Sequence, residues 1–185
     1  MTGADSLTNL LTVLAGEADA KVREVGGSNK GDRVEEYQRA VGLSPGSPWC
    51  AAFVGWSMMR SRGLTKPPSW CSGSAITTWH RAKRKAGPLG STTPLDPDYR
   101  SKIAPGWVWV RAKDADGAKA ARSGTWVQGH IGIVTAVDEI GFHTIEGNTN
   151  SAGSREGDGV YRKLHKWTDT IDLGRTVGWF DSTSI

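Results

Sequence analysis

The sequence is poor in cysteine and has no long apolar run, and both absences limit what the chain is. Only 2 of its 185 residues are cysteine, too few for a disulfide framework and without the spacing of zinc ligands. No segment has the roughly 20 consecutive apolar residues that cross a bilayer. Repeats and low-complexity tracts are also missing. These features predict one soluble domain, residues 1–185, with its own core and no membrane insertion.

A secretion signal and a nucleic-acid-binding module are also missing. Segment 1–22 has no basic leader, and polar residues interrupt its apolar stretch. We therefore expect synthesis in the cytoplasm without a signal peptide. The net charge of +4 suits polyanionic partners, but no nucleic-acid module is recognisable. The densest basic run, HRAKRK at 80–85, is typical of a solvated helix end.

The pattern of apolar residues predicts helices in the first half of the chain and strands in the second. Helices are expected from residue 7 to near the glycine pair at 26–27 and over 32–40, 48–62 and 74–85, followed by a loop rich in Pro and Gly over 86–106. Short, turn-separated strands are expected over 107–111, 130–137, 142–147, 159–164 and 176–181. Such strands pair antiparallel. The predicted fold class is therefore α+β, with N-terminal helices packed on a C-terminal antiparallel β-sheet.

Tryptophan is abundant, with nine residues. It is common on surfaces that bind flat or sugar-like ligands, but four tryptophans sit among apolar neighbours: Trp56, Trp107, Trp109 and Trp126. Their surroundings favour the hydrophobic core for most of them.

The segment GSPWCAAFVGWSM (46–58) places a cysteine at the start of a predicted helix. Ser47 is a candidate N-cap, and Pro48 suits the first helical position, where its missing N–H costs nothing. The unpaired N–H groups of the first turn favour the thiolate form of Cys50. The alternative is a small apolar residue packed under the helix start. Cys71 lies before another apolar helix, and we expect it to pack in this way.

His130 is the candidate partner of Cys50. It opens a strand between Gly129 and Gly132, where missing side chains let other groups approach. Strand alternation places Glu146 and Asn148 on one face of the next strand. A carboxylate beside an imidazole fixes the ring and its tautomer. Asn148 is a candidate to orient the ring or to donate to an anion.

The turn between these two strands decides how His130 and Glu146 meet. A turn centred near Asp138 pairs them directly, whereas a turn displaced toward Ile140 leaves them diagonal. Both arrangements are open from the sequence, as is a core role for His130. The other histidines, His80, His143 and His165, are expected on the surface: His80 and His165 lie in basic, polar stretches, and alternation points His143 away from Glu146.

Three blocks in this order resemble the CHAP family of cysteine- and histidine-dependent amidohydrolases and peptidases: NKGDRVEEYQRAVGLSPGSPWCAAFVGW (29–56), GHIGIV (129–134) and IEGNTN (145–150). The resemblance covers about residues 24–180. It implies a papain-like core, with Cys50 as nucleophile, His130 as base, Glu146 as orienting group and Asn148 as fourth polar residue. It also implies peptidoglycan as substrate, cleaved at an amide bond by an endopeptidase or an N-acetylmuramoyl-L-alanine amidase.

The backbone N–H of Cys50 is the expected first donor to the oxyanion, because it is unpaired at the helix start. Ser44, Ser47 and Tyr37 are candidates for the second donor. Segment 112–128 is expected to be an extra loop that shapes the cleft. Its DADG stretch (114–117) is only a fragment of a calcium loop, so we expect no metal and no cofactor.

We expect a monomer that acts on the cell wall after release, as a phage endolysin does, or after delivery as a lytic effector. Two alternatives stay open from the sequence. One is an inactive wall-binding or phage-structural protein with the same fold. The other is a cysteine hydrolase that acts on proteins or small amides.

Overall fold

The computed structural model of the chain describes residues 3–150 and 157–185 and has helices in its first half and a sheet in its second. The α+β class predicted from the sequence is confirmed. Four helices come first, at α1 (Gly3–Asp19), α2 (Asp32–Ala40), α3 (Cys50–Ser61) and α4 (Ala75–Ala86). Three short helices lie among the strands, at α5 (Tyr99–Lys102), α6 (Ala115–Arg122) and α7 (Thr170–Arg175).

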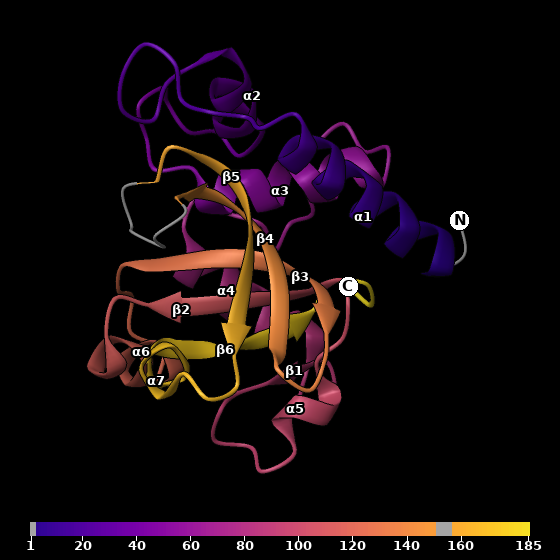
Figure 1. Cartoon of the computed structure of the whole chain (residues 1–185), viewed down its shortest axis with the longest axis vertical. Helices are drawn as coiled ribbons and strands as arrows, with labels where there is room; N and C mark the ends of the chain where they lie inside the picture. The colour runs from indigo at the N-terminus through magenta and orange to yellow at the C-terminus, as the bar shows by residue number, and fades with distance from the viewer. Residues whose placement is uncertain (1–2, 151–156) are drawn as a thin grey trace.

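The strands form one six-stranded sheet in the order β1-β6-β2-β3-β4-β5. Every pair in it is antiparallel, as predicted. Its strands are β1 (Ser91–Thr92), β2 (Trp107–Ala112), β3 (Gly129–Val137), β4 (Gly141–Thr149), β5 (Gly159–Lys166) and β6 (Thr176–Asp181). Figure 1 shows the ends of β4 and β5 rising toward α2 and α3, so the edge of the sheet meets the helices there.

Helix α3 is the centre of the core. Nearly all of its residues are buried, from Cys50 to Ser61, as expected of a helix that is apolar on every side. It contacts α1 and α2 on one side and β3 and β4 on the other. Because the sheet alternates, Val108 and Val110 face this helical layer. Trp107 and Trp109 face a second cluster on the opposite side of the sheet.

A buried ionic group joins α1 to α2. Glu17 accepts hydrogen bonds from the Tyr37 hydroxyl and from the Arg33 guanidinium. The Arg33 guanidinium also lies 4.4 Å from the Trp56 ring of α3. Tyr37 is completely buried, and its hydroxyl donates its hydrogen bond to Glu17. It therefore does not line the cleft, and its candidacy as an oxyanion donor was wrong.

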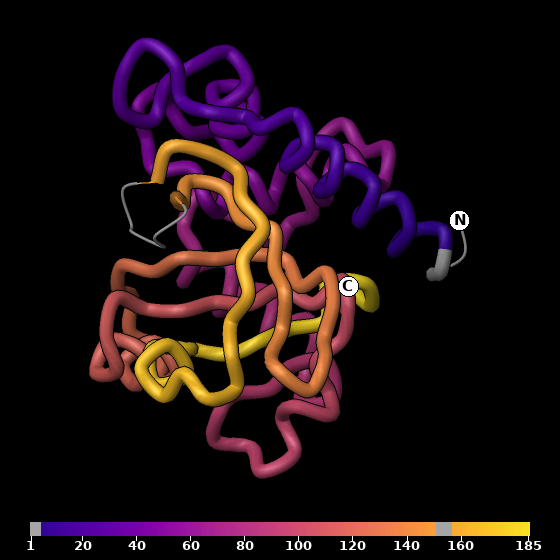
Figure 2. Tube along the Cα trace, viewed as in Figure 1, coloured from indigo at the N-terminus to yellow at the C-terminus, as the bar shows by residue number. Residues whose placement is uncertain are grey.

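The start of α1 and the C-terminus lie on the same side of the molecule in the view of Figure 2. The guanidinium of Arg62, just after α3, donates to the carbonyl of Ile185 at 2.7 Å. Within the described residues, no helix is both long and apolar enough to span a membrane.

Four short elements were not predicted: β1, α5, α6 and α7. Helix α6 falls in segment 112–128, which was expected to be a loop. Asp114 is its N-cap and accepts a hydrogen bond from the N–H of Gly117 at 2.7 Å. The DADG stretch is thus the start of a helix, and Asp114 is the N-cap of this helix. The first helix also ends at Asp19, well before the predicted end near Gly26 and Gly27.

Candidate active site

Cys50 is the first residue of α3, and no side chain caps this helix. The predicted cap at Ser47 was wrong, because α3 begins three residues later. The Ser47 carbonyl instead accepts a hydrogen bond from the side-chain amide of Gln38 at 2.7 Å. The N–H of Cys50 has no acceptor within the helix, since it belongs to the first turn. The thiol and a backbone donor therefore lie at the same point.

His130 is the residue that the sheet brings to this thiol. It is 5% exposed on β3, it lines the same cleft as Cys50, and its interaction with Cys50 raises its pKa. Its Nε2 donates to Oε2 of Glu146 on β4 at 2.8 Å. With Nε2 occupied in this way, Nδ1 is the ring nitrogen left for Cys50. The structure thus brings Cys50, His130 and Glu146 into one chain of contacts.

The register of β3 and β4 makes His130 and Glu146 diagonal neighbours. Ile133 pairs with Ile145, and Val134 pairs with Thr144. Continuing this register places Glu146 opposite residue 132 rather than opposite His130. The turn runs from Asp138 to Gly141, whose backbone groups are joined by a 3.0 Å hydrogen bond. Of the two registers open from the sequence, the displaced turn is correct.

Gly132 leaves the space that the Glu146 carboxylate needs to reach its diagonal neighbour His130. A Cβ at position 132 would lie 2.6 Å from Cγ of Glu146, closer than side chains approach. The missing side chain of Gly132 therefore leaves the space through which Glu146 reaches His130. The sequence prediction that glycine beside His130 permits a close approach is confirmed at this position.

Charge stabilises the imidazolium form of His130. Burial alone would lower the pKa of His130, but its hydrogen bonds to Cys50 and Glu146 and their charges raise that pKa to about 9. Burial alone would raise the pKa of Glu146, yet the hydrogen bonds and charges of His130 and His165 hold it well below its ordinary value. At neutral pH the pair is an imidazolium beside a carboxylate.

His165 is a second histidine on the same carboxylate, and its predicted exposure was wrong. Its side chain is only 10% exposed. Nε2 lies 2.7 Å from Oε1 of Glu146, and Nδ1 lies 2.6 Å from Oδ2 of Asp172 in α7. Strand alternation carried a signal for this placement, since position 165 shares its face of β5 with the half-buried positions 161 and 163.

The two remaining histidines differ from each other. His143 is half-exposed and bonds Asp138 at 2.8 Å, so its predicted place away from Glu146 is confirmed. His80 was predicted to be exposed, but it is half-buried, and its Nε2 lies 2.8 Å from the carbonyl oxygen of Ala121. Neither residue lines the cleft that contains Cys50.

Asn148 holds the chain just before the nucleophile. Its backbone has a positive φ of 54°, at a point where the pairing of β4 with β5 changes register. Its Oδ1 accepts from the backbone N–H of Trp49 at 3.0 Å, and its Nδ2 donates to Asn29 Oδ1 and to the carbonyl of Gly157. These bonds fix the residue that precedes Cys50, and the His130 ring is not among its partners.

Glu24 and Asn29 belong to the same support and were not found from the sequence. Glu24 Oε1 accepts from the indole N–H of Trp49, and Oε2 accepts from the backbone N–H of Asn29, both at 2.8 Å. A lone glutamate in a loop gives no signal of such a role. Together with Asn148, it fixes Trp49 from two directions.

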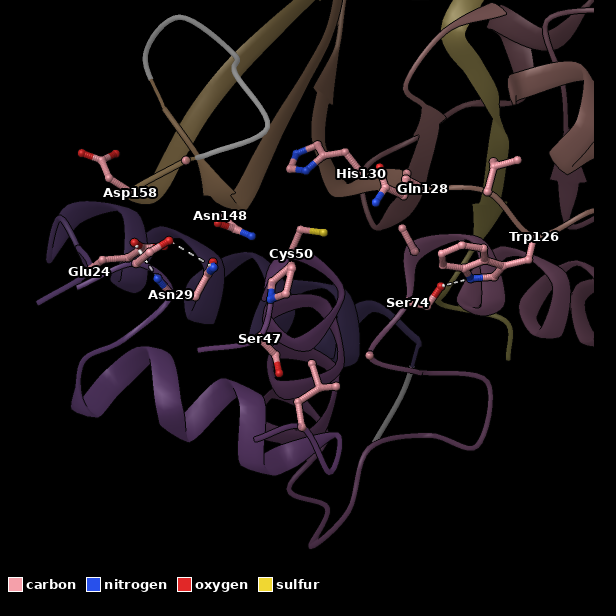
Figure 3. Close-up of a pocket in the computed structure, with 18 residues that line it drawn as sticks. Glu24, Asn29, Ser47, Cys50, Ser74, Trp126, Gln128, His130, Asn148 and Asp158 are labelled. Atoms are coloured by element: carbon pink, nitrogen blue, oxygen red, sulfur yellow. Dashed lines mark hydrogen bonds between the residues drawn. The ribbon is translucent and has the colours of Figure 1, made fainter. Parts of the chain in front are cut away.

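Cys50 and His130 open into a cleft of about 590 Å³. Figure 3 shows Glu24, Asn29 and Asp158 on one side of the thiol, and Ser74 and Trp126 on the other. Of the three candidates for a second oxyanion donor, Ser47 lines this cleft, whereas Ser44 and Tyr37 do not.

Trp126 differs from the other tryptophans. It is 61% exposed, whereas the other eight are buried, so the core interpretation holds for Trp56, Trp107 and Trp109 but was wrong for Trp126. Its indole N–H donates to the Ser74 hydroxyl at 3.1 Å, which fixes the ring at the edge of the cleft. The residues just before His130 do line the cleft, as predicted for segment 112–128.

No group of three or more metal-ligating side chains occurs among residues 3–150 and 157–185. A thiol at a helix start, an imidazole in the same cleft and a buried carboxylate bonded to that imidazole are the parts of a nucleophilic hydrolase site.

Fold and site together define an α+β protein with a thiol–imidazole–carboxylate site. The family model described as CHAP domain matches residues 42–148, more than half of the chain. The chain belongs to the CHAP domain family, a hydrolytic family of peptidoglycan amidases and peptidases. No curated protein and no solved structure matches it. Cys50, His130, Glu146 and Asn148 lie inside the match, whereas Glu24, His165 and Asp172 lie outside it.

The two cysteines should differ in reactivity. Burial raises the pKa of Cys71 to about 12, although the Arg62 charge opposes this shift. Cys71 is therefore a neutral thiol at pH 7, whereas Cys50 lies beside an imidazolium. We expect iodoacetamide to label Cys50 in the folded protein and to leave Cys71 unmodified, as measured by peptide mass spectrometry. Labelling in denaturant is the control and should modify both. Equal rates in the folded state would contradict the assignment.

Gly132→Ala should displace Glu146 from His130, because the new Cβ occupies the space of the glutamate side chain. We expect a loss of about 1–3 kcal/mol in the free energy of unfolding and slower labelling of Cys50. Chemical denaturation and the labelling assay measure these effects.

Gly16→Ala is the matched control, because nothing lies within 4 Å of the added Cβ on α1. There we expect a gain of about 0.5–1 kcal/mol. If the Gly132→Ala variant is as stable and as reactive as the parent protein, Gly132 is not needed for Glu146 to reach His130.

Proposed function

We propose that the protein hydrolyses an amide bond of bacterial peptidoglycan with Cys50 as its nucleophile. The observation that carries this proposal is that Cys50, at the start of α3, and His130 line one cleft, with His130 hydrogen-bonded to the buried Glu146. Membership of the CHAP domain family supplies the substrate class. Two reactions fit this site, that of an endopeptidase and that of an N-acetylmuramoyl-L-alanine amidase.

The first half of the reaction transfers the acyl group to the enzyme. The Cys50 thiolate attacks the carbonyl carbon, and the backbone N–H of Cys50 donates to the oxygen that becomes negative. His130 holds the proton that the leaving nitrogen needs. When the tetrahedral intermediate collapses, the C–N bond breaks and His130 gives this proton to the departing amine. A thioester to Cys50 remains.

Water completes the cycle. Neutral His130 takes a proton from a water molecule as the water oxygen attacks the thioester. The C–S bond breaks, the acid product leaves, and Cys50 and His130 return to the thiolate and imidazolium forms. Glu146 keeps the ring in place throughout, and its negative charge stabilises each imidazolium state.

Several properties of the whole protein remain proposals of the same kind. Cys50, His130 and Glu146 come from a single chain, which supports action as a monomer. The net charge of +4 suits a cell wall with anionic polymers. We propose that the protein is made in the cytoplasm and reaches the wall on release by a phage or on delivery by a secretion machine, with no nucleic acid as partner and no insertion into the membrane.

Substitutions at the three residues should separate their roles on purified sacculi. Cys50→Ala should abolish hydrolysis, because no acyl-enzyme forms. His130→Ala should be nearly as damaging, since the leaving amine loses its acid. Glu146→Gln should keep measurable turnover, because an amide still orients the ring but does not stabilise the imidazolium. His143→Ala is the control and should leave activity near normal.

Product release from digested sacculi, followed by mass spectrometry, measures these rates and identifies the bond. Full activity of Cys50→Ala would contradict a cysteine mechanism. A folded wild-type protein that binds sacculi without releasing product would instead indicate a wall-binding or structural role. Activity on protein or small-amide substrates alone would indicate a different cysteine hydrolase.

Trp126 is expected to contribute to substrate binding, because its exposed ring is held at the edge of the cleft by Ser74. Loss of an aromatic contact of about 0.5–1.5 kcal/mol predicts that Trp126→Ala lowers kcat/KM by about 2- to 12-fold without a loss of stability. Leu89→Ala is the control, because Leu89 is 95% exposed and lies outside the cleft. Equal kcat/KM for Trp126→Ala and the parent protein would exclude this ring from the binding site.

A further inference from the structure

The buried carboxylate of Glu146 has more partners than a thiol–imidazole site needs. Besides His130, it contacts His165 and accepts a hydrogen bond from the Thr144 hydroxyl. His165 in turn contacts Asp172. A chain of five groups thus runs from the cleft into the protein: Cys50, His130, Glu146, His165 and Asp172.

The hydrogen bonds of His165 fix its charge. Both of its ring nitrogens face a carboxylate oxygen, at 2.7 Å and 2.6 Å. An ionised carboxylate only accepts hydrogen bonds, and a neutral imidazole has one donor and one acceptor nitrogen. The contacts of His165 with Glu146 and Asp172 can both be hydrogen bonds to ionised carboxylates only when Nε2 and Nδ1 each carry a proton. With both carboxylates ionised, this geometry fits an imidazolium between Glu146 and Asp172, and the Thr144 hydroxyl oxygen, 3.1 Å from Nε2, is a further acceptor for it.

The surroundings of His165 favour this cation. Its ring centroid lies 4.1 Å from that of Trp109 and 4.8 Å from that of Phe142, and aromatic rings attract a cation on their faces. Burial alone would lower the pKa of His165, but the hydrogen bonds and charges of Asp172 and Glu146 raise it. Burial alone would raise the pKa of Asp172, but His165 and the nearby Arg111 lower it.

We propose that His165 is a permanently charged positioning residue that keeps Glu146 ionised and aimed at His130, with Asp172 as its counter-charge. This inference rests on the proposed function, because it assigns His165 and Asp172 to the support of the Cys50–His130 pair. Neither residue reaches the substrate. Their effect is on the pH range in which Glu146 and His130 hold the working charges.

The sign of that effect follows from the charges. His165 is a cation next to Glu146, so its removal makes the carboxylate easier to protonate and moves the acid limb of activity to higher pH. Without the His165 cation, the negative charge of Glu146 is balanced by His130 alone. His130 then holds its proton more tightly, so its pKa rises. The alkaline limb therefore also moves to higher pH. A shift of about one pH unit on each side is expected for the loss of a charge at this separation.

The first experiment reads the charge of His165 directly. Nitrogen-15 NMR of the wild-type protein at pH 7 should show both ring nitrogens protonated in two buried histidines, His130 and His165, with the His165 signals assigned by their loss in His165→Phe. A neutral tautomer of His165 at pH 7 would overturn the proposal. This measurement needs no substrate, so it decides the inference even where His165→Phe does not fold, with assignment then made through the backbone.

The second experiment is the pH profile of kcat/KM on sacculi. His165→Phe keeps the ring between Trp109 and Phe142 but has no donor, and both limbs should move to higher pH. Asp172→Asn keeps an acceptor but removes an anion instead of a cation, so while His165 stays charged the limbs should move by a smaller amount to lower pH. His143→Gln is the matched control, because it breaks a similar histidine–aspartate pair at the surface and should move neither limb.

The outcomes separate this inference from the proposed function. A His165→Phe profile that is lower at every pH with unmoved limbs would overturn the proposal, because it would show that His165 supports Glu146 without its charge. A wild-type protein inactive on sacculi would refute the proposed function, while the NMR result would still decide the charge of His165. A shift in His165→Phe that His165→Gln does not reverse supports a role of charge rather than of hydrogen bonding alone.

Discussion

Glu146 carries a negative charge where only 2% of the residue is exposed. A carboxylate in such a place is stable only when hydrogen bonds and opposite charges replace the water that it has lost. His130 and His165 provide both, one at each oxygen. The order of the site follows from this requirement. The hydrogen bond to the buried carboxylate fixes the His130 ring. A ring fixed in this position can act as the acid and base for the Cys50 thiol.

The sheet supplies the space for this arrangement through an irregular part of the β3–β4 pair. The register shifts between Val134 and Ala136, and the unpaired residue between them moves the turn relative to the start of β3. Glu146 then faces Gly132 instead of His130. With any larger residue at 132, the carboxylate would be blocked from the ring. One β-bulge and one glycine therefore decide whether the imidazole and the carboxylate meet.

The sequence predicts the parts of this site better than the contacts between them. Periodicity places α2 and β6 at their observed bounds, because their apolar patterns are regular and their ends are marked by turn residues. Cys50, His130 and Glu146 stand out because their residue types at helix and strand starts have a chemical meaning. The register was open, because a bulge has no reliable sequence signal and moves every later pair by one residue.

His165 was missed for a different reason. Its neighbours Arg162, Lys163 and Lys166 make the segment look solvated, although alternate positions of an edge strand face opposite sides. Arg162 and Lys166 lie on the exposed face of β5, whereas Lys163 lies on the same half-buried face as His165, so the basic character of the segment does not tell the two faces apart. Glu24 was missed because its role depends on long-range contacts with Trp49 and Asn29, which no local pattern records.

Residues outside the CHAP match, together with Asn148 at its last position, complete the site on both sides. On the side of the nucleophile, Glu24 and Asn148 bond the indole and the backbone N–H of Trp49, so the residue before Cys50 is fixed although α3 has no side-chain cap. The first N–H groups of the helix thereby stay available to a developing oxyanion. On the side of the sheet, His165 and Asp172 fix the carboxylate that holds the base. Each reacting group is thus supported by a pair of residues from a distant part of the chain. The nucleophile and the base consequently depend on the complete fold, and the segment 42–148 alone would lack a support on each side.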